Sequence, residues 1–335
     1  MQSDKITGIK SVDFKIRALG HGVVNWNGPT DVNGLVNGNV IKLKNHSMPK
    51  LRGYSNKRFK SEGTYSLKFA DDIDFSRNRL YISQNCIRHH LFRDQALSDL
   101  QESVVAQNMD KLLCSITGLV RGYVIPATEN KRTSALLIAD FVDQKGNGNY
   151  EQMGRSGSKE KKATKTGEEK STTLFSKTTF GDTEYEGFGS ISIEQLQFIS
   201  LSDRFSRKAM MINNQKEGIE IASKISDYLN GIGDTDKARA VYHNNYVRRG
   251  AIFDIGEEGI LLNDKAIDIL VNETLDRLRD LNIRQGKGYM YVDSVEVDYN
   301  DGNSGKDMMR IRANPEAIKI NKGDSEYAVY FKGRS

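Results

Sequence analysis

Apolar residues recur three and four positions apart in two segments of the chain. In residues 218–229, and again in 264–281, this spacing gathers the apolar side chains on one face. Asn263 or Asp264 stands at the start of the second segment, and both residue types accept hydrogen bonds from the first turn of a helix. The pattern predicts two amphipathic helices that pack on a sheet.

Apolar and polar residues alternate in three other segments, residues 6–19, 190–199 and 284–299. Alternation with period two predicts strands that bury one face. The pattern slips once within 190–199, and we interpret the slip as a β-bulge. A shorter run at 308–312 predicts a final strand.

Residues 80–95 combine a strand end with the start of a helix. Ser83 follows three apolar residues and is a favoured N-cap. The unpaired N–H groups of a first helical turn carry partial positive charge, and Arg88, His89 and Arg93 follow within three turns. This combination predicts a phosphate site at the helix start. On these residues alone, a surface helix with solvated arginines is the alternative.

The order of the elements indicates the fold class. Residues 111–126 are rich in β-forming residues and broken by glycine, which predicts a helix end followed by a strand. Without its long polar insertions the chain then approximates the order βαββαβ. This order is the split ferredoxin-like unit of α+β proteins.

The first polar insertion covers residues 27–74 and is too long for an irregular loop without a role. We interpret it as a protruding subdomain. Between Lys44 and Lys60 it holds six basic residues, no Asp or Glu, and the aromatic residues Tyr54 and Phe59. Basic and aromatic residues in alternation suit phosphates and stacked bases, although charge runs are often only solvated loops.

The second insertion covers residues 127–180 and resembles a long hairpin. Its middle part, residues 154–173, holds six Lys or Arg residues and no large apolar residue. Such a segment cannot bury enough surface to order itself, so we predict a flexible basic tip.

Composition changes this picture little. The chain has 335 residues, enough for one large domain with insertions or two ordinary ones. Its net charge is +5. Its two cysteines, Cys86 and Cys114, form no C-x-x-C pair, which favours a reducing compartment. No apolar run approaches the roughly 18 residues needed to cross a bilayer. We therefore expect a soluble cytoplasmic protein with no membrane partner.

Four short motifs place basic residues beside aromatic ones. Residues 287–292 partly match the RNA-recognition-motif signature, and residues 121–124 match it less well. Residues 246–250 place arginines beside a Tyr, and residues 175–180 place Lys and hydroxyl groups beside Phe. These basic and hydroxyl groups are common phosphate partners. Strands rich in Tyr and Gly are frequent, so a structural role is the alternative for each motif.

The search for catalytic residues finds no complete set. His89 and His90 are adjacent and cannot point at one metal ion. His90 and Asp94 lie on the side of the predicted helix that also carries Ile87 and Leu91, which favours a partly buried contact over acid–base chemistry. Phosphate-loop and dinucleotide fingerprints are also missing. We expect no enzyme, no metal and no cofactor; the alternative is an RNA-processing nuclease that uses His89, His90 and Asp94.

Four long segments carry a family resemblance: residues 20–28, 80–93, 188–200 and 284–293. Together they make the chain resemble the backbone subunit of the minimal type I-F variant CRISPR surveillance complex, Cascade. The resemblance spans nearly the whole chain.

This resemblance implies a hand-shaped protein. A palm like an RNA-recognition motif, with helical additions, would consist of residues 1–26, 75–126 and 181–335. Residues 27–74 would be a finger-like insertion, and residues 127–180 a β-hairpin thumb. The resemblance also implies that copies polymerise head to tail along a CRISPR RNA beside other Cascade subunits. Each thumb would fold over the RNA and displace a nucleotide at regular intervals, which leaves the guide bases to pair with target DNA, without nuclease activity.

The expected RNA contacts come from local chemistry at these motif positions. They are Asn25, Trp26, Arg52, Ser83, Gln84, Asn85, Arg88, His89, Arg93, Lys131, Arg132, Lys177, Thr178, Arg248, Arg249, Arg284 and Lys287. Phosphate contacts would make binding independent of the guide sequence. A scaffold that binds only protein partners is a further alternative, and it predicts no nucleic acid in the purified protein.

Overall fold

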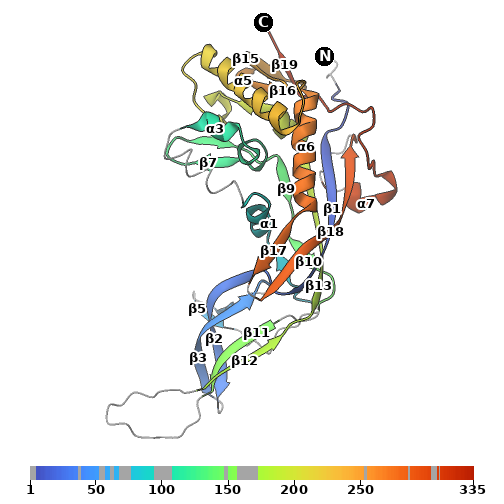
Figure 1. Ribbon diagram of the computed structural model, residues 1–335. Coiled ribbons are helices and arrows are strands. Elements are labelled where there is room, and N and C mark those ends of the chain that lie inside the picture. Colours follow the sequence, from blue (N-terminus) through green and yellow to red (C-terminus); the bar gives the residue numbers. More distant parts are fainter. Residues whose placement is uncertain are drawn as a thin grey trace.

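The computed structural model describes most of the chain (Figure 1). The described ranges are residues 5–36, 39–52, 57–60, 64–67, 77–93, 108–146, 150–156, 173–252, 255–285, 287–302, 308 and 310–335. Within them, helices and antiparallel sheets alternate along the chain, so the expected α+β class is confirmed.

A seven-stranded sheet forms the centre of the fold. Its strand order is β17 (Asn282–Gln285), β18 (Gly288–Asn300), β1 (Ser11–Gly22), β13 (Asp182–Ser192), β10 (Phe141–Asp143) and β6 (Tyr81–Ile82), and β9 (Leu136–Ile138) also pairs with β13. Every pairing in it is antiparallel. Strand β1 confirms the predicted strand, because Val12, Phe14 and Ile16 are fully buried on one face; on the other face Arg17 is exposed, although Asp13 is buried.

Helices cover one face of the central sheet. They are α1 (Gln84–Leu91) and α6 (Asp264–Arg279); the π-helical turn η2 (Thr117–Arg121) contacts α6, and α3 (Met109–Leu113) contacts η2. Helix α6 lies along β18 (Figure 1) and fully buries Ile267, Leu270 and Leu278. Asn263 caps it, as predicted, by accepting a hydrogen bond from the Ala266 N–H at 3.0 Å.

A second, four-stranded sheet stands beside the first. Its order is β14 (Phe198–Ser200), β16 (Gly256–Leu262), β15 (Ala240–Arg248) and β19 (Phe331–Gly333). Helix α5 (Gln215–Ile232) packs against β15, which confirms the amphipathic helix predicted at residues 218–229. The smaller elements nearby are β7 (Tyr123–Ile125), β8 (Asn130–Arg132), α4 (Ile193–Gln197) and η3 (Asp203–Phe205). Helix α7 (Arg310–Ala313), which contacts η4 (Pro315–Ala317), packs instead against β1 and β18 of the central sheet.

Three hairpins project from this body. They are β2 (Trp26–Val36) with β3 (Asn39–Pro49), β4 (Lys57–Lys60) with β5 (Thr64–Leu67), and β11 (Tyr150–Ser156) with β12 (Thr173–Thr179). Strand β11 contacts β3, and Figure 1 shows the hairpins together at the end of the molecule opposite the C-terminus. The two insertions of the sequence therefore meet in space.

Three expectations from the sequence are corrected. The segment 190–199 is not one bulged strand: β13 ends at Ser192, whose hydroxyl caps α4 by accepting from the Gln195 N–H. The predicted final strand at 308–312 contains the start of α7 instead. The hairpin excursion is also shorter than 127–180, because β9 and β10 belong to the central sheet and only β11 and β12 form the hairpin.

Candidate nucleic-acid interface

The start of α1 is held by protein acceptors. As predicted, Ser83 is the N-cap, and its hydroxyl accepts from the Cys86 N–H at 3.4 Å. The Ser83 N–H donates to Asn25 Oδ1 at 3.0 Å, and the Gln84 N–H donates to the Asp140 carboxylate at 2.9 Å. These N–H groups were expected to hold phosphate. The structure corrects this expectation, because an internal carboxylate already occupies the positive end of the helix.

A cation from the first insertion reaches the same place. Lys50 follows β3, and its Nζ lies 3.5 Å from Ser83 Oγ. Its backbone N–H donates to the Asn25 carbonyl at 3.0 Å, so the end of β3 is fixed to the loop that precedes β2. The side chains of Gln84 and Asn85 are exposed beside it, and Arg52 is exposed two residues further on. The positive charge at this helix start therefore comes from side chains.

A second group of basic residues lies at the adjoining end of the central sheet. Lys287 Nζ lies 5.6 Å from the centroid of the Trp26 ring, a cation–π distance. Arg284, Lys287 and His21 line a cavity of about 660 Å³ together with Tyr289 and Tyr291. The tyrosine rings are 49 % and 46 % exposed, and Tyr289 stacks on His21 with ring centroids 6.3 Å apart.

These two groups join into one surface, which we call the basic strip. It consists of Asn25, Trp26, Lys50, Ser83, Arg284 and Lys287. The Lys287–Trp26 and Asn25–Ser83 contacts connect its members from both ends of the chain. Among the expected RNA contacts, the structure thus brings Asn25, Trp26, Ser83, Arg284 and Lys287 together.

The rest of this face of the sheet is acidic. Lys15 lies 3.5 Å from Glu186 and 3.8 Å from Glu296. Arg17 pairs with Glu184 at 2.8 Å and with Asp293 at 2.7 Å, and its hydrogen bond lowers the pKa of Glu184. At the far end, Arg310 of α7 pairs with Asp298 at 2.6 Å, and Arg312 of α7 lies over the Phe188 ring. Because carboxylates outnumber cations among these residues, this part of the sheet face disfavours phosphates, in contrast to the basic strip.

Arg132 is used inside the protein. It is 6 % exposed and donates to the carbonyls of Leu119, Gln195, Leu196 and Phe198 at 3.0–3.3 Å. Burial lowers its pKa to about 10. We therefore correct its expected role: its guanidinium caps the last turn of α4 and is not accessible to RNA.

Arg88 and Arg248 also have partners within the protein. Arg88 donates to the Leu136 carbonyl at 2.8 Å, and its pKa is lowered by burial and by the nearby Arg121. Arg248 forms two hydrogen bonds, at 2.5 and 2.9 Å, with the Glu194 carboxylate. Both placements favour structural roles.

The remaining expected contacts lie elsewhere. His89 and Arg93 are exposed beyond the middle of α1, while Lys131 on β8 and Arg249 after β15 are half-buried. Lys177 and Thr178 fall on β12, where the side chains lie outside the described residues. The structure does not bring this set together.

Of the three residues of the nuclease alternative, the structure describes only His89 and His90. The His89 and His90 rings meet edge-on at 5.2 Å, and burial, followed by His89 and Arg93, lowers the pKa of His90. Asp94 lies outside the described residues. In the part of the chain that the structure describes, no three His, Cys, Asp or Glu side chains are grouped to hold a metal ion. No helix in that part is long and apolar enough to cross a membrane.

The expected RNA contacts did not include Lys50 of the basic strip or His21, Tyr289 and Tyr291 of the cavity beside it. Lys50 lies within the basic run, and Tyr289 and Tyr291 lie within the partial RNA-recognition signature, so these two patterns were the signals that could have found them. His21 gave no signal beyond its glycine neighbours.

The chain matches the model of a known protein family. The family model described as "Type I-Fv CRISPR-associated protein Cas7fv-like" matches residues 8–334. No curated protein matches the chain. The family match includes every residue of the basic strip.

Proposed function

We propose the following function for this chain, which belongs to the Cas7fv-like family of type I-Fv CRISPR-associated proteins: it is a non-catalytic backbone subunit that binds CRISPR RNA. The basic strip carries this proposal. It joins Trp26 and Lys50, at the two ends of the hairpin β2–β3, with the distant Lys287 into one basic and aromatic surface. Lys50, Arg284 and Lys287 hold phosphates, while the exposed Tyr289 and Tyr291 rings stack on bases.

Binding through phosphates and ring faces is independent of base sequence. A subunit that carries different guides needs this property. The acidic remainder of the sheet face confines the RNA to the end of the sheet. The guide bases that do not stack on the protein stay available to pair with target DNA.

The fold supports a hand-shaped subunit. The order β18–β1–β13–β10, antiparallel throughout and with helices between the strands in sequence, is that of the split βαββαβ unit and supports an RNA-recognition-motif palm. The hairpins β2–β3 and β4–β5 act as the finger, and β11–β12 acts as the thumb that folds over the RNA and displaces a nucleotide at regular intervals. Copies assemble head to tail along the RNA, beside other Cascade subunits.

Purification tests this proposal against the alternatives. The protein, expressed with a CRISPR RNA, is expected to retain RNA after washing, which the ultraviolet absorbance spectrum detects. The retained RNA is expected to stay intact with added divalent metal and to resist an added ribonuclease. Protein free of nucleic acid would instead support a scaffold that binds only protein partners. Cleavage that EDTA stops would support a nuclease.

A further inference from the structure

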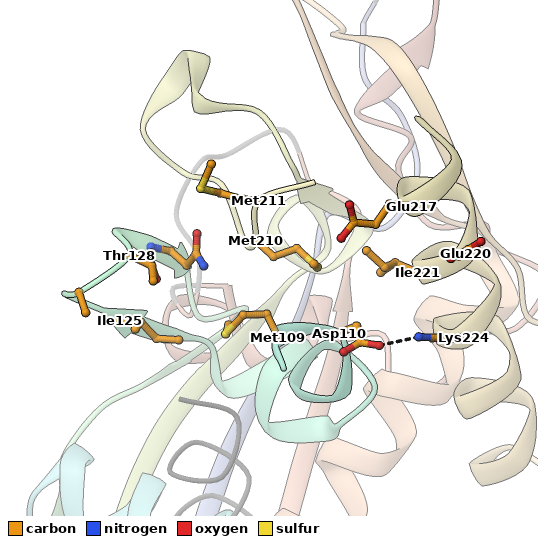
Figure 2. Close-up of a pocket in the computed structure, with 12 residues that line it drawn as sticks. Met109, Asp110, Ile125, Thr128, Met210, Met211, Glu217, Glu220, Ile221 and Lys224 are labelled. Carbon is orange, nitrogen blue, oxygen red and sulfur yellow. Dashed lines mark hydrogen bonds and ion pairs between the residues drawn. The ribbon is translucent and has the colours of Figure 1, made fainter. Parts of the chain in front are cut away.

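A second cavity, of about 570 Å³, lies outside the basic strip (Figure 2). Met109, Met210 and Met211 face it from one side, and Ile221 faces it from α5. Met211 is 62 % exposed, so the apolar lining continues to the protein surface. Thioether side chains adapt to the shape of an apolar partner. We call this cavity the methionine socket.

The rim of the methionine socket is acidic. Asp110 and Lys224 pair at 2.6 Å and cancel each other. The Glu217 carboxylate accepts a hydrogen bond from the Asn213 N–H. Glu220 lies 3.8 Å from the ammonium group of Lys216, whose side chain is 86 % exposed. Such an exposed pair is weak. The socket therefore disfavours phosphate and favours a cationic partner.

An unpaired acceptor also lines the socket. Asn130 is 4 % exposed, and its Oδ1 has no hydrogen-bond partner among the described residues. A buried acceptor without a donor is unfavourable. An N–H group from an incoming segment would satisfy it.

The chain itself carries a complementary segment. Ile252 is 87 % exposed, in the turn after β15 that Gly250 shapes with a φ of +74°. Arg249 precedes it, and in the described part of the structure no carboxylate pairs with this guanidinium. The turn thus offers an aliphatic side chain and a cation within four residues.

We propose that the methionine socket of one copy receives the Ile252 turn of the next copy. Ile252 fills the apolar lining, Arg249 faces Glu217 and Glu220, and a turn N–H donates to Asn130. Because socket and turn are different surfaces, the contact is heterologous and generates an open chain of copies. This inference rests on the proposed head-to-tail assembly and names its contact.

Two matched pairs of variants test the contact. Met211→Asp and Ile252→Asp each put a charge into it, whereas the controls Val241→Asp and Ile320→Asp change aliphatic residues, 53 % and 70 % exposed, that do not line the socket. The first pair is expected to weaken addition of a second copy on a long RNA by about tenfold or more, as mass photometry measures. Binding of a single copy to a short RNA is expected to stay unchanged.

A charge exchange and a cross-link complete the test. Glu220→Arg and Arg249→Glu should each impair assembly, and a chain with both changes should recover it. Without RNA, copies with Met211→Cys should cross-link to copies with Ile252→Cys through a short bismaleimide. Assembly on RNA that is insensitive to Met211→Asp and Ile252→Asp would overturn the socket and leave the proposed function standing. Cross-linking without any RNA binding would overturn the proposed function and leave the socket contact standing. A protein that neither cross-links nor binds RNA would overturn the contact and the function together.

Discussion

Replacing Arg284 and Lys287 together by alanine is expected to lower the affinity for a short single-stranded RNA by about 10- to 100-fold. Arg284 is exposed, and Lys287 lies over Trp26 at the centre of the basic strip. Each phosphate contact to a single strand contributes about 0.7 to the slope of log affinity against log salt, so two lost contacts should reduce the slope by about 1.4. Fluorescence anisotropy over a salt series measures both quantities.

The control removes the same charges elsewhere. Lys265 and Arg279 lie on α6, with side chains 41 % and 51 % exposed. Their joint replacement by alanine also lowers the net charge by two, yet it leaves the strip intact. If both double variants lost affinity equally, general charge would explain binding, and the strip would have no special role.

Replacing Arg132 by methionine is expected to destabilise the protein by about 3 kcal/mol or more, since it leaves four carbonyl acceptors without their donor. Two of these carbonyls, those of Gln195 and Leu196, end α4 and have no next helical turn to bond with. Urea unfolding, followed by circular dichroism, measures the loss. At a temperature where the variant is still folded, its affinity for RNA should match that of the unchanged protein.

Lys131→Met is the matched control for this prediction. Lys131 neighbours Arg132 on β8 but is only half-buried, so its replacement should cost less than about 1 kcal/mol. An Arg132→Met protein with unchanged stability and weakened RNA binding would restore Arg132 as an RNA contact.

Elements with local signals could be predicted from the sequence. Ser83 and Asn263 carry N-cap chemistry before helical spacing, and both caps are observed. The prediction of a single strand at 190–199 was wrong because Ile193 and Leu196 fit a helical spacing as well as a slipped alternation. Strands β9 and β10 have three residues each, too few to show a period, so their place in the central sheet required tertiary contacts.

The candidate site shows the same limit. Arg132 and Arg248 resemble Arg284 in the sequence, since each stands within three residues of another basic residue. Only the fold shows that Arg132 caps α4 and that Arg248 pairs with Glu194 while Arg284 stays exposed. The contact of Lys50 with Ser83 could not be identified from the sequence, because it joins residues 33 positions apart.

The helix start at Ser83 now has a different role. It was expected to bind phosphate through its N–H groups, but Asp140 and Asn25 accept from them. The helix start instead fixes Lys50 and Trp26 in position, and side chains supply the charge.

The central claim is that the protein binds RNA through its phosphates, whatever the base sequence. The most direct measurement compares two single-stranded RNAs of equal length and unrelated sequence, with purified RNA-free protein, across a salt series. The proposal predicts similar affinities for both RNAs and a steep fall of both with rising salt. Affinities that do not change with salt, or that differ strongly between the two sequences, would contradict it.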